Sequence, residues 1–233
     1  ASKPTADIME AANRRYKEND LENALKLFSA VCSRFDATAD KEQQRLFMQA
    51  FLLRGYILNT HGSYSLALDS YLQARGIAEK CRFKDALPNI YNKTGIIFAE
   101  INDLETALFY YRKALALADD QPSGDTRQLI LNNLLYVYSL KGNADSTKYY
   151  YRKLVGQSPN NGCSQYDNIF NLALVYEVDN KPDSALMHFH RAADFAARQM
   201  HSPLSQAAAH SSIAHIYSKR GMLDSAAHYF RLN

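Results

Sequence analysis

The chain has no tryptophan and is poor in three other residue types: it contains three cysteines, six prolines and nine glycines in 233 residues. No apolar run approaches the ~18 residues of a membrane span, and no signal peptide is present. Because the cysteines are few, odd in number and far apart, a disulfide framework is not expected. The net charge of +3 is spread along the chain without a basic run, so we expect no direct nucleic-acid binding.

Sequence motifs for chemistry are also missing. There is no Walker A sequence, no GxSxG, no GxGxxG and no HExxH. His188 and His190 are two residues apart, which places them on different faces of a helix, where they cannot share a ligand. We therefore expect no catalytic residue, no cofactor and no metal, and the segment is predicted not to be an enzyme.

One pattern dominates the chain: an alanine recurs at intervals of about forty residues in a fixed setting. An aromatic residue follows it by four positions, a Gly or Asn precedes it by five, and in most copies a small residue precedes it by twelve. The recurring position is held by Ala24, Ala67, Ala107, Thr147, Ala185 and Ala226. Thr147 departs from the rule, as does Leu135 at the small position of the same copy.

These spacings predict a helix, a tight turn and a second helix in each copy. Residues three, four and seven apart lie on one stripe of a helix. Gly or Asn can adopt the left-handed conformation that ends a helix, and a following Asp, Asn or Ser can cap the next one. Candidate caps are Asp20, Ser63, Asp103 and Asn143. Small residues would let the two helices approach closely, with the aromatics filling the space between pairs.

The pattern resembles the tetratricopeptide repeat (TPR). The clearest copy lies between Tyr91 and Ala118, where the matching positions are Tyr91, Thr94, Gly95, Phe98, Asn102, Asp103, Leu104, Ala107, Tyr111 and Ala114. The resemblance covers nearly the whole chain and implies an all-α fold, an α-solenoid in which about six antiparallel helix pairs form a right-handed superhelix. The period near forty is longer than the family's usual repeat and is similar to that of bacterial TPR-containing transcriptional regulators and signalling proteins.

We expect a single array over 1–233. The six repeats are predicted at about 5–36, 41–81, 84–118, 125–155, 163–200 and 203–233, with polar breaks at 119–125 and 156–162. The last repeat is predicted to be incomplete, and the chain to be a fragment of a longer protein. A membrane span is expected only outside it. The compartment stays open between the periplasm, as the sensor arm of a membrane regulator, and the cytoplasm.

The resemblance also implies where a partner would bind. In TPR stacks the first helix of each pair lines a concave groove, so residues near the middle of each first helix are candidates. The predicted protein- or peptide-binding residues are Tyr56, Asn59, Asn92, Asn132, Tyr136, Phe170 and Glu177. A chaperone-tail clamp is not expected, because Met9 and Leu52 stand where such a clamp would want charge.

The resemblance thus predicts a non-catalytic segment that binds a protein or peptide. Its leading interpretation is the sensing or interaction region of a larger bacterial signalling or transcriptional regulator. A stand-alone adaptor or scaffold is the alternative. An accessory region of an enzyme whose catalytic domain lies elsewhere is a third possibility. Self-association of the chain through exposed apolar ends is also possible.

Overall fold

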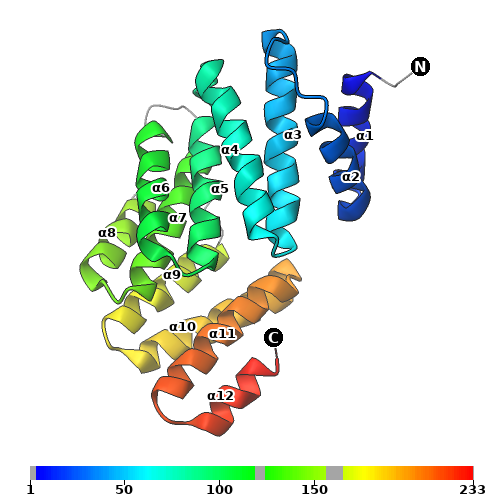
Figure 1. Cartoon of the computed structure of the whole chain (residues 1–233). Helices are drawn as coiled ribbons and strands as arrows, with labels where there is room; N and C mark the ends of the chain where they lie inside the picture. The colour runs from blue at the N-terminus through cyan, green and yellow to red at the C-terminus, as the bar shows by residue number, and fades with distance from the viewer. Residues whose placement is uncertain (1–3, 119–123, 156–164, 233) are drawn as a thin grey trace. The chain divides into compact units, whose positions relative to one another are not determined.

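The computed structural model describes residues 4–118, 124–155 and 165–232, and it divides into two compact units, residues 1–122 and 123–233. The N-terminal unit contains three helix pairs (Figure 1). Each pair consists of a first and a second helix joined by a tight turn. The pairs are α1 (Thr5–Lys17) with α2 (Leu21–Cys32), α3 (Lys41–Thr60) with α4 (Tyr64–Lys80), and α5 (Leu87–Glu100) with α6 (Leu104–Ala118).

The C-terminal unit repeats this plan. Its pairs are α7 (Gly124–Leu140) with α8 (Ala144–Val155), α9 (Gln165–Val178) with α10 (Pro182–Phe195), and α11 (Pro203–Lys219) with α12 (Leu223–Phe230). A short π-helical turn, Ala196–Met200, extends α10. The described residues contain helices and no strand, so the all-α helical-repeat fold is confirmed. Whether both units belong to one array stays a prediction.

The turn inside every pair has the backbone conformation that the sequence predicts. A residue with positive φ, between 56° and 73°, stands at each of the six predicted turn positions. Gly pays no steric cost there, and Asn is the side chain that best tolerates the left-handed region. The six residues are Asn19, Gly62, Asn102, Gly142, Asn180 and Gly221.

The predicted caps are correct in three cases and wrong in one. The side chains of Asp20, Asp103 and Asn143 accept hydrogen bonds from backbone N–H groups three residues on, at 3.4, 3.2 and 3.0 Å. Ser63 makes no side-chain cap bond to α4. The departure at Thr147 is also explained: its hydroxyl donates to the Asn143 carbonyl at 2.8 Å, so a polar group is buried at the alanine position without losing a hydrogen bond.

The small residues of the repeat permit close helix contact, as expected. A Cβ placed on Gly55 would lie 2.6 Å from the ring of Tyr71, and one placed on Gly95 would lie 2.6 Å from the ring of Tyr111. Carbon atoms do not approach that closely without displacement. In repeats 2 and 3 the first helix therefore lies directly against the aromatic ring of the second.

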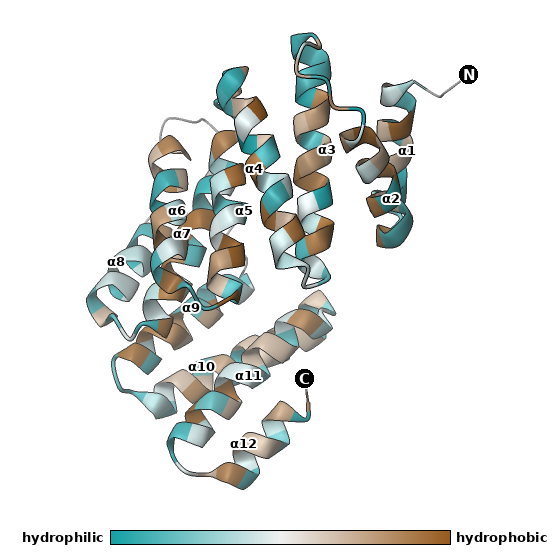
Figure 2. Ribbon diagram, viewed as in Figure 1, coloured by the Kyte–Doolittle hydropathy of each residue, from teal (hydrophilic) through white to brown (hydrophobic). Residues whose placement is uncertain are grey.

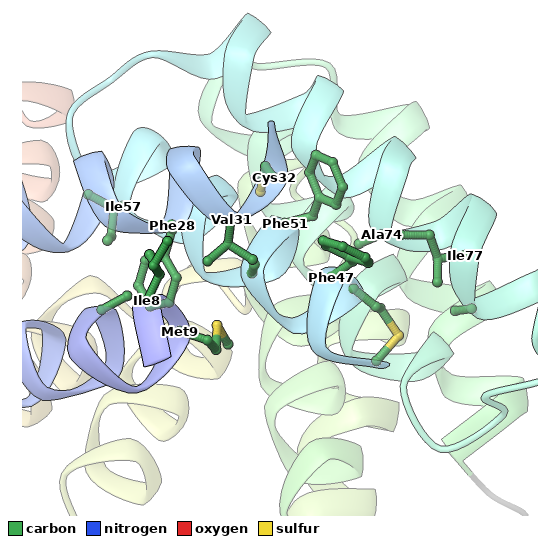
Figure 3. Packing of buried hydrophobic residues seen from close by; sticks show 14 of the residues in the cluster. Ile8, Met9, Phe28, Val31, Cys32, Phe47, Phe51, Ile57, Ala74 and Ile77 are labelled. Carbon is green, nitrogen blue, oxygen red and sulfur yellow. The ribbon is translucent and has the colours of Figure 1, made fainter. Parts of the chain in front are cut away.

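The core of each unit lies between its helices. In the N-terminal unit Phe28, Val31, Phe47 and Ile77 pack together across α2, α3 and α4 (Figure 3). In the C-terminal unit one cluster joins α9, α10 and α11 through Tyr166, Ala192, Ala193, Ala196 and Ala209. Hydrophobic and hydrophilic residues occur along every helix (Figure 2), as amphipathic packing requires.

Neighbouring repeats are also joined by polar contacts. Arg45 of α3 pairs with Asp85 in the next repeat at 2.7 Å. The Tyr166 hydroxyl donates to the Ser205 carbonyl at 2.7 Å, and Arg220 pairs with Asp183 at 2.6 Å. The ion pairs are mostly exposed, so each adds little stability.

Two sequence predictions concern cysteines and membranes. Cys32 and Cys81 are free thiols, and burial raises the pKa of Cys32 to about 12. Cys163 lies outside the described residues, as do most of the two predicted polar breaks. Of the helices that the structure describes, none is both long enough and apolar enough to cross a membrane.

Candidate functional site: two grooves lined by the first helices

The first helices of the N-terminal unit lie side by side, α1 against α3 and α3 against α5. Their exposed faces enclose a cavity of about 530 Å³. Side chains from all three helices line it, and they combine amides, tyrosines and aliphatics with one charge. The lining residues are Met9, Asn13, Tyr16, Gln49, Leu52, Leu53, Tyr56, Asn89 and Lys93.

Two tyrosines and a lysine form the polar end of this pocket. The rings of Tyr16 and Tyr56 meet edge to face at 6.0 Å. Burial raises the pKa of Tyr16, and so do its electrostatic interaction and its hydrogen bond with Tyr56. The Lys93 ammonium lies 4.7 Å from the centre of the Tyr56 ring, a cation–π contact. The three side chains come from α1, α3 and α5, so the pocket is shared by three repeats.

The C-terminal unit has a groove of its own, with a volume of about 600 Å³. It is lined by first helices alone, namely α7, α9 and α11. Aromatic and aliphatic side chains supply the floor, and charged and hydroxyl groups lie along it. The lining residues are Tyr136, Ser139, Leu140, Tyr166, Asp167, Phe170, Leu174, Glu177, Ala208, Ser211, Ser212, His215 and Lys219.

Aromatic contacts fix the position of Phe170 in the apolar part of this second groove. Phe170 stacks on Tyr166 at 5.6 Å and meets Phe189 of α10 edge to face at 5.1 Å. At the far end Glu177 pairs with Lys219 at 3.2 Å. The aromatic floor is thus fixed by packing, and the lysine of this groove already has a carboxylate partner.

The predicted site residues fall into two groups. Tyr56 lines the first groove, and Tyr136, Phe170 and Glu177 line the second. The other three predicted residues, all asparagines, lie differently. Because no bound partner is present, a binding role for any of the seven stays a prediction.

The three asparagines are mainly engaged with the protein itself. Asn92 is only 5% exposed. Asn132 accepts a hydrogen bond from Asn171 at 2.7 Å and lines a smaller neighbouring cavity with Asp125 and Asp167. Asn59 lies 3.5 Å from Glu100, to which its amide donates. Asn92 is buried because it turns toward the core, one position away from the exposed stripe of α5.

Sequence reasoning missed Lys93, Asn89 and Gln49. Lys93 directly follows the predicted Asn92, Asn89 lies about one turn before it, and Gln49 lies two turns before the predicted Tyr56. The available signal was the i, i+4 spacing of Asn89 and Lys93, which places both on one face of α5. His215 and Lys219 share such a face on α11.

Within residues 4–118, 124–155 and 165–232, no three His, Cys, Asp or Glu side chains come together as a metal ion would require. His188 instead stacks on Tyr176 at 5.3 Å, and burial lowers its pKa. It acts as a packed aromatic side chain.

Comparisons with known proteins agree with this architecture. The family model described as tetratricopeptide repeat matches residues 88–121, which contain α5 and α6. No curated protein sequence matches the chain. The likeness to solved structures therefore has to be judged on the fold.

Three solved structures illustrate that likeness. The apo form of RapI superposes with a TM-score of 0.80 at 15% identity, over 98% of this chain and 81% of that one. The Rap conjugation gene regulator of plasmid pLS20, in complex with the Phr* peptide, gives 0.69 at 15% identity, over 96% and 71%. A tetratricopeptide repeat protein from Parabacteroides merdae gives 0.61 at 16% identity, over 97% and 77%.

At 15–16% identity these superpositions show a similarity of fold and nothing more. The family model supplies the sequence evidence within one repeat, and the repeat positions and turn conformations extend the same plan to the other five helix pairs. One repeat of the chain, residues 88–121, thus matches the tetratricopeptide-repeat model, and the whole fold is similar to that of solved tetratricopeptide-repeat proteins.

Proposed function

We propose that this chain binds a peptide or an extended protein segment non-covalently along the first-helix grooves of its two units, without catalysing a reaction. The observation that carries the proposal is that each unit presents a cavity, of about 530 and 600 Å³, lined by side chains of first helices. Aromatic side chains provide contact area at low entropic cost, and amides and hydroxyls can pair with a peptide backbone.

The solved relatives give this proposal a precedent. The pLS20 Rap regulator is described in complex with a peptide, and a further relative with a TM-score of 0.52, YrrB, is described as a TPR protein with an unusual peptide-binding site. Both proteins are about as different in sequence from this chain as the other relatives. They support binding of an extended ligand as the use of such a groove and leave the ligand's identity to experiment.

Within that function, the sensing or interaction region of a bacterial signalling or transcriptional regulator is our leading interpretation. It is favoured by the high similarity of fold to RapI and to the pLS20 gene regulator. The alternatives are a stand-alone adaptor and an accessory region of an enzyme. A DNA-binding or kinase module encoded in the same polypeptide would support the regulator, and a catalytic domain there would support the third alternative.

Selection of phage-displayed random peptides on the purified chain would test the binding function, with affinities measured by calorimetry. The groove variants are Tyr56→Ala and Tyr136→Ala. Tyr149→Ala is the control, because Tyr149 is 50% exposed on the second helix α8, against 45% for Tyr136 on α7. We expect selected peptides to lose about tenfold in affinity with one groove variant and nothing with the control.

Two results would count against the function. Selection could yield no peptide above background, or the recovered peptides could bind both groove variants as they bind the wild type. The second result would place the binding surface on the second helices or on the turns. Circular dichroism of each variant would show that the helical fold is intact.

A further inference from the structure

A separate cavity of about 300 Å³ lies between α7 and α9, next to the C-terminal groove. Four of its lining residues share one face of α7, because they are three, four and seven residues apart. These four are Asp125, Gln128, Leu129 and Asn132. The fifth, Asp167, lies in the first turn of α9 and also lines the groove, so the cavity adjoins the groove at this residue.

Gln128 is the residue that points to a ligand. Its side chain is only 5% exposed, and among the residues that the structure describes its amide has no hydrogen-bond partner. A side-chain amide carries two donors and one acceptor oxygen, and burying them unpaired lowers stability. Because Gln128 lines the cavity, a group bound there could supply the partner that the protein itself does not.

The cavity carries negative charge. Asp125 and Asp167 lie in the first turns of their helices, where a carboxylate is favourable in any protein, so the two acids alone do not indicate a site. The two helix N-termini contribute about half a positive charge each, which leaves the cavity negative by about one charge. Among the lining residues that the structure describes, no Lys, Arg or His supplies the balance. A ligand with a single positive charge would do so.

The remaining groups match an ammonium on an alkyl chain. An ammonium has three N–H donors and no acceptor, and the two carboxylates and the Gln128 Oε1 atom can accept from it. Asn171 donates to Asn132 Oδ1 at 2.7 Å, which holds the Asn132 side chain in the wall of the cavity. Leu129 is 58% exposed and offers apolar surface to methylene groups. Charge, acceptors and apolar wall thus agree on one class of ligand.

We propose that the cavity between α7 and α9 binds an organic cation that carries a primary ammonium group, with Asp125 and Asp167 as counter-ions and Gln128 as a neutral acceptor. The proposal does not depend on peptide binding by the grooves. A divalent metal ion is disfavoured, because Ca²⁺ and Mg²⁺ take about six or more oxygen ligands, and no three acidic or histidine side chains converge in the described residues. The ammonium belongs either to a free small amine or to a lysine side chain.

The test titrates the whole chain with four probes at constant ionic strength, followed by NMR of the backbone and glutamine side-chain amides. The probes are n-butylamine, its neutral counterpart n-butanol, putrescine, and N-acetyl-lysine methylamide. We expect n-butylamine to shift the Gln128 side-chain signals saturably and n-butanol to leave them unchanged. Putrescine binding at least as tightly as the lysine derivative identifies a free amine as the ligand, and tighter binding of the lysine derivative identifies a lysine side chain.

Two variants test the residues. Asp125→Asn removes one charge and should weaken n-butylamine binding about fivefold. Gln128→Leu removes an acceptor from a charged donor at nearly constant side-chain volume and should weaken it about tenfold. Asp145→Asn is the matched control, because Asp145 is the second residue of α8 as Asp125 is of α7, but it does not line the cavity. It should leave the affinity unchanged.

Three results would overturn the proposal. The chain could respond equally to n-butylamine and n-butanol, n-butylamine binding could survive both cavity substitutions, or Asp145→Asn could weaken binding as much as Asp125→Asn, which would assign the effect to net charge. Preferential binding of Ca²⁺ over every amine would replace the ammonium by a metal ion. Circular dichroism checks the fold of each variant. If Gln128→Leu unfolds, Asp125→Asn still decides the question, because Asp125 is exposed.

Discussion

The two grooves are formed by the same kind of helix but differ in charge. In the N-terminal groove Lys93 is the single charged lining residue, and among residues 4–118 no acidic side chain forms an ion pair with it. In the C-terminal groove Asp167 and Glu177 lie with Lys219, and the lysine is paired with Glu177 at 3.2 Å. Their aromatic content is similar: Tyr16 and Tyr56 line the first, and tyrosines and a phenylalanine line the second.

This difference shows how a repeat separates folding from recognition. The alanine, the aromatic four residues later and the turn residue are set by helix packing in both units. Groove positions lie on another stripe of the first helix and are not among the positions that recur in the repeat pattern. Two units with one scaffold can therefore present different chemistry, and each prediction below alters either the shared scaffold or the differing surface.

The shared scaffold predicts equal costs in the two units for losing the repeat aromatic. Phe28 and Phe189 are both fully buried, so Phe28→Ala and Phe189→Ala should each lower the free energy of unfolding by about 3–5 kcal/mol. Phe230 holds the same repeat position but is 54% exposed, and Phe230→Ala should cost less than about 1 kcal/mol. Urea unfolding followed by circular dichroism measures all three. Markedly unequal costs for Phe28 and Phe189 would show that the two scaffolds differ.

The next effect concerns the close helix contact of repeat 3. Gly95→Ala should destabilise the N-terminal unit by about 1–3 kcal/mol, because the new Cβ would lie 2.6 Å from the Tyr111 ring. Gly76→Ala is the control: Gly76 lies within α4, with nothing within 4 Å of a new Cβ. It should stabilise by about 0.5–1 kcal/mol through helix propensity. Thermal unfolding of both variants gives the sign. Destabilisation by both substitutions would show that the loss of glycine itself, and not the contact with Tyr111, causes the effect.

The charge difference between the grooves can be reduced by one substitution. Glu177→Gln removes the carboxylate partner of Lys219 and leaves an unpaired lysine in the C-terminal groove. In a Lys93→Gln background it should create a preference for carboxylate-bearing peptides of no more than about fivefold, since exposed ion pairs are worth about 1 kcal/mol or less. Retention on the immobilised chain of two amidated heptapeptide pools, which differ only in a central Glu or Gln, measures it.

Asp183→Asn is the control for that experiment, because it frees Arg220, which pairs with Asp183 at 2.6 Å, and neither residue lines the groove. It should create no preference. A preference with Asp183→Asn as large as that with Glu177→Gln would mean that net charge, and not the groove, attracts the peptides.

The smallest expected effect is a pH dependence of the C-terminal unit. Burial lowers the pKa of His188, and the positive charge of Arg191 lowers it further. Burial also lowers the pKa of His190; there the charge of His210 lowers the pKa as well, and the charge of Asp194 raises it. The unfolded chain therefore binds more protons than the folded chain as the pH falls through the unfolded histidine pKa of about 6.5. Stability that is present above that pH is lost gradually toward pH 5.

Urea unfolding at pH 7 and pH 5 would measure this loss in the wild type and in the double variant His188→Gln, His190→Gln. The double variant should lose less stability between the two pH values. Identical losses in the two proteins would contradict the assignment. Asp85 and Asp179, whose pKa values are lowered by Arg45 and Lys148, act at lower pH and do not interfere.

The sequence by itself determined the helix pairs and their turns. Gly or Asn five residues before each repeat alanine predicted six left-handed turns, and all six are present. The aromatic positions predicted the core, because helical spacing and size decide which side chains fill the space between helices. These features are local or repeat at a fixed interval, so a single chain displays them without a structure.

Only the tertiary structure decided which first-helix residues face the groove and which of its charges are paired. Adjacent helical residues point about 100° apart, so Asn92 is buried while Lys93 lines the groove, and the repeat pattern does not say which of the two faces a partner. Whether a lysine has an acidic partner depends on residues in other repeats. Glu177, which pairs with Lys219, lies 42 residues from it in the sequence, whereas no acidic side chain of the described N-terminal unit pairs with Lys93. Helical periodicity places residues relative to one another on one helix, but which stripe faces the groove, and which charges meet across repeats, depends on packing between helices that are distant in the sequence.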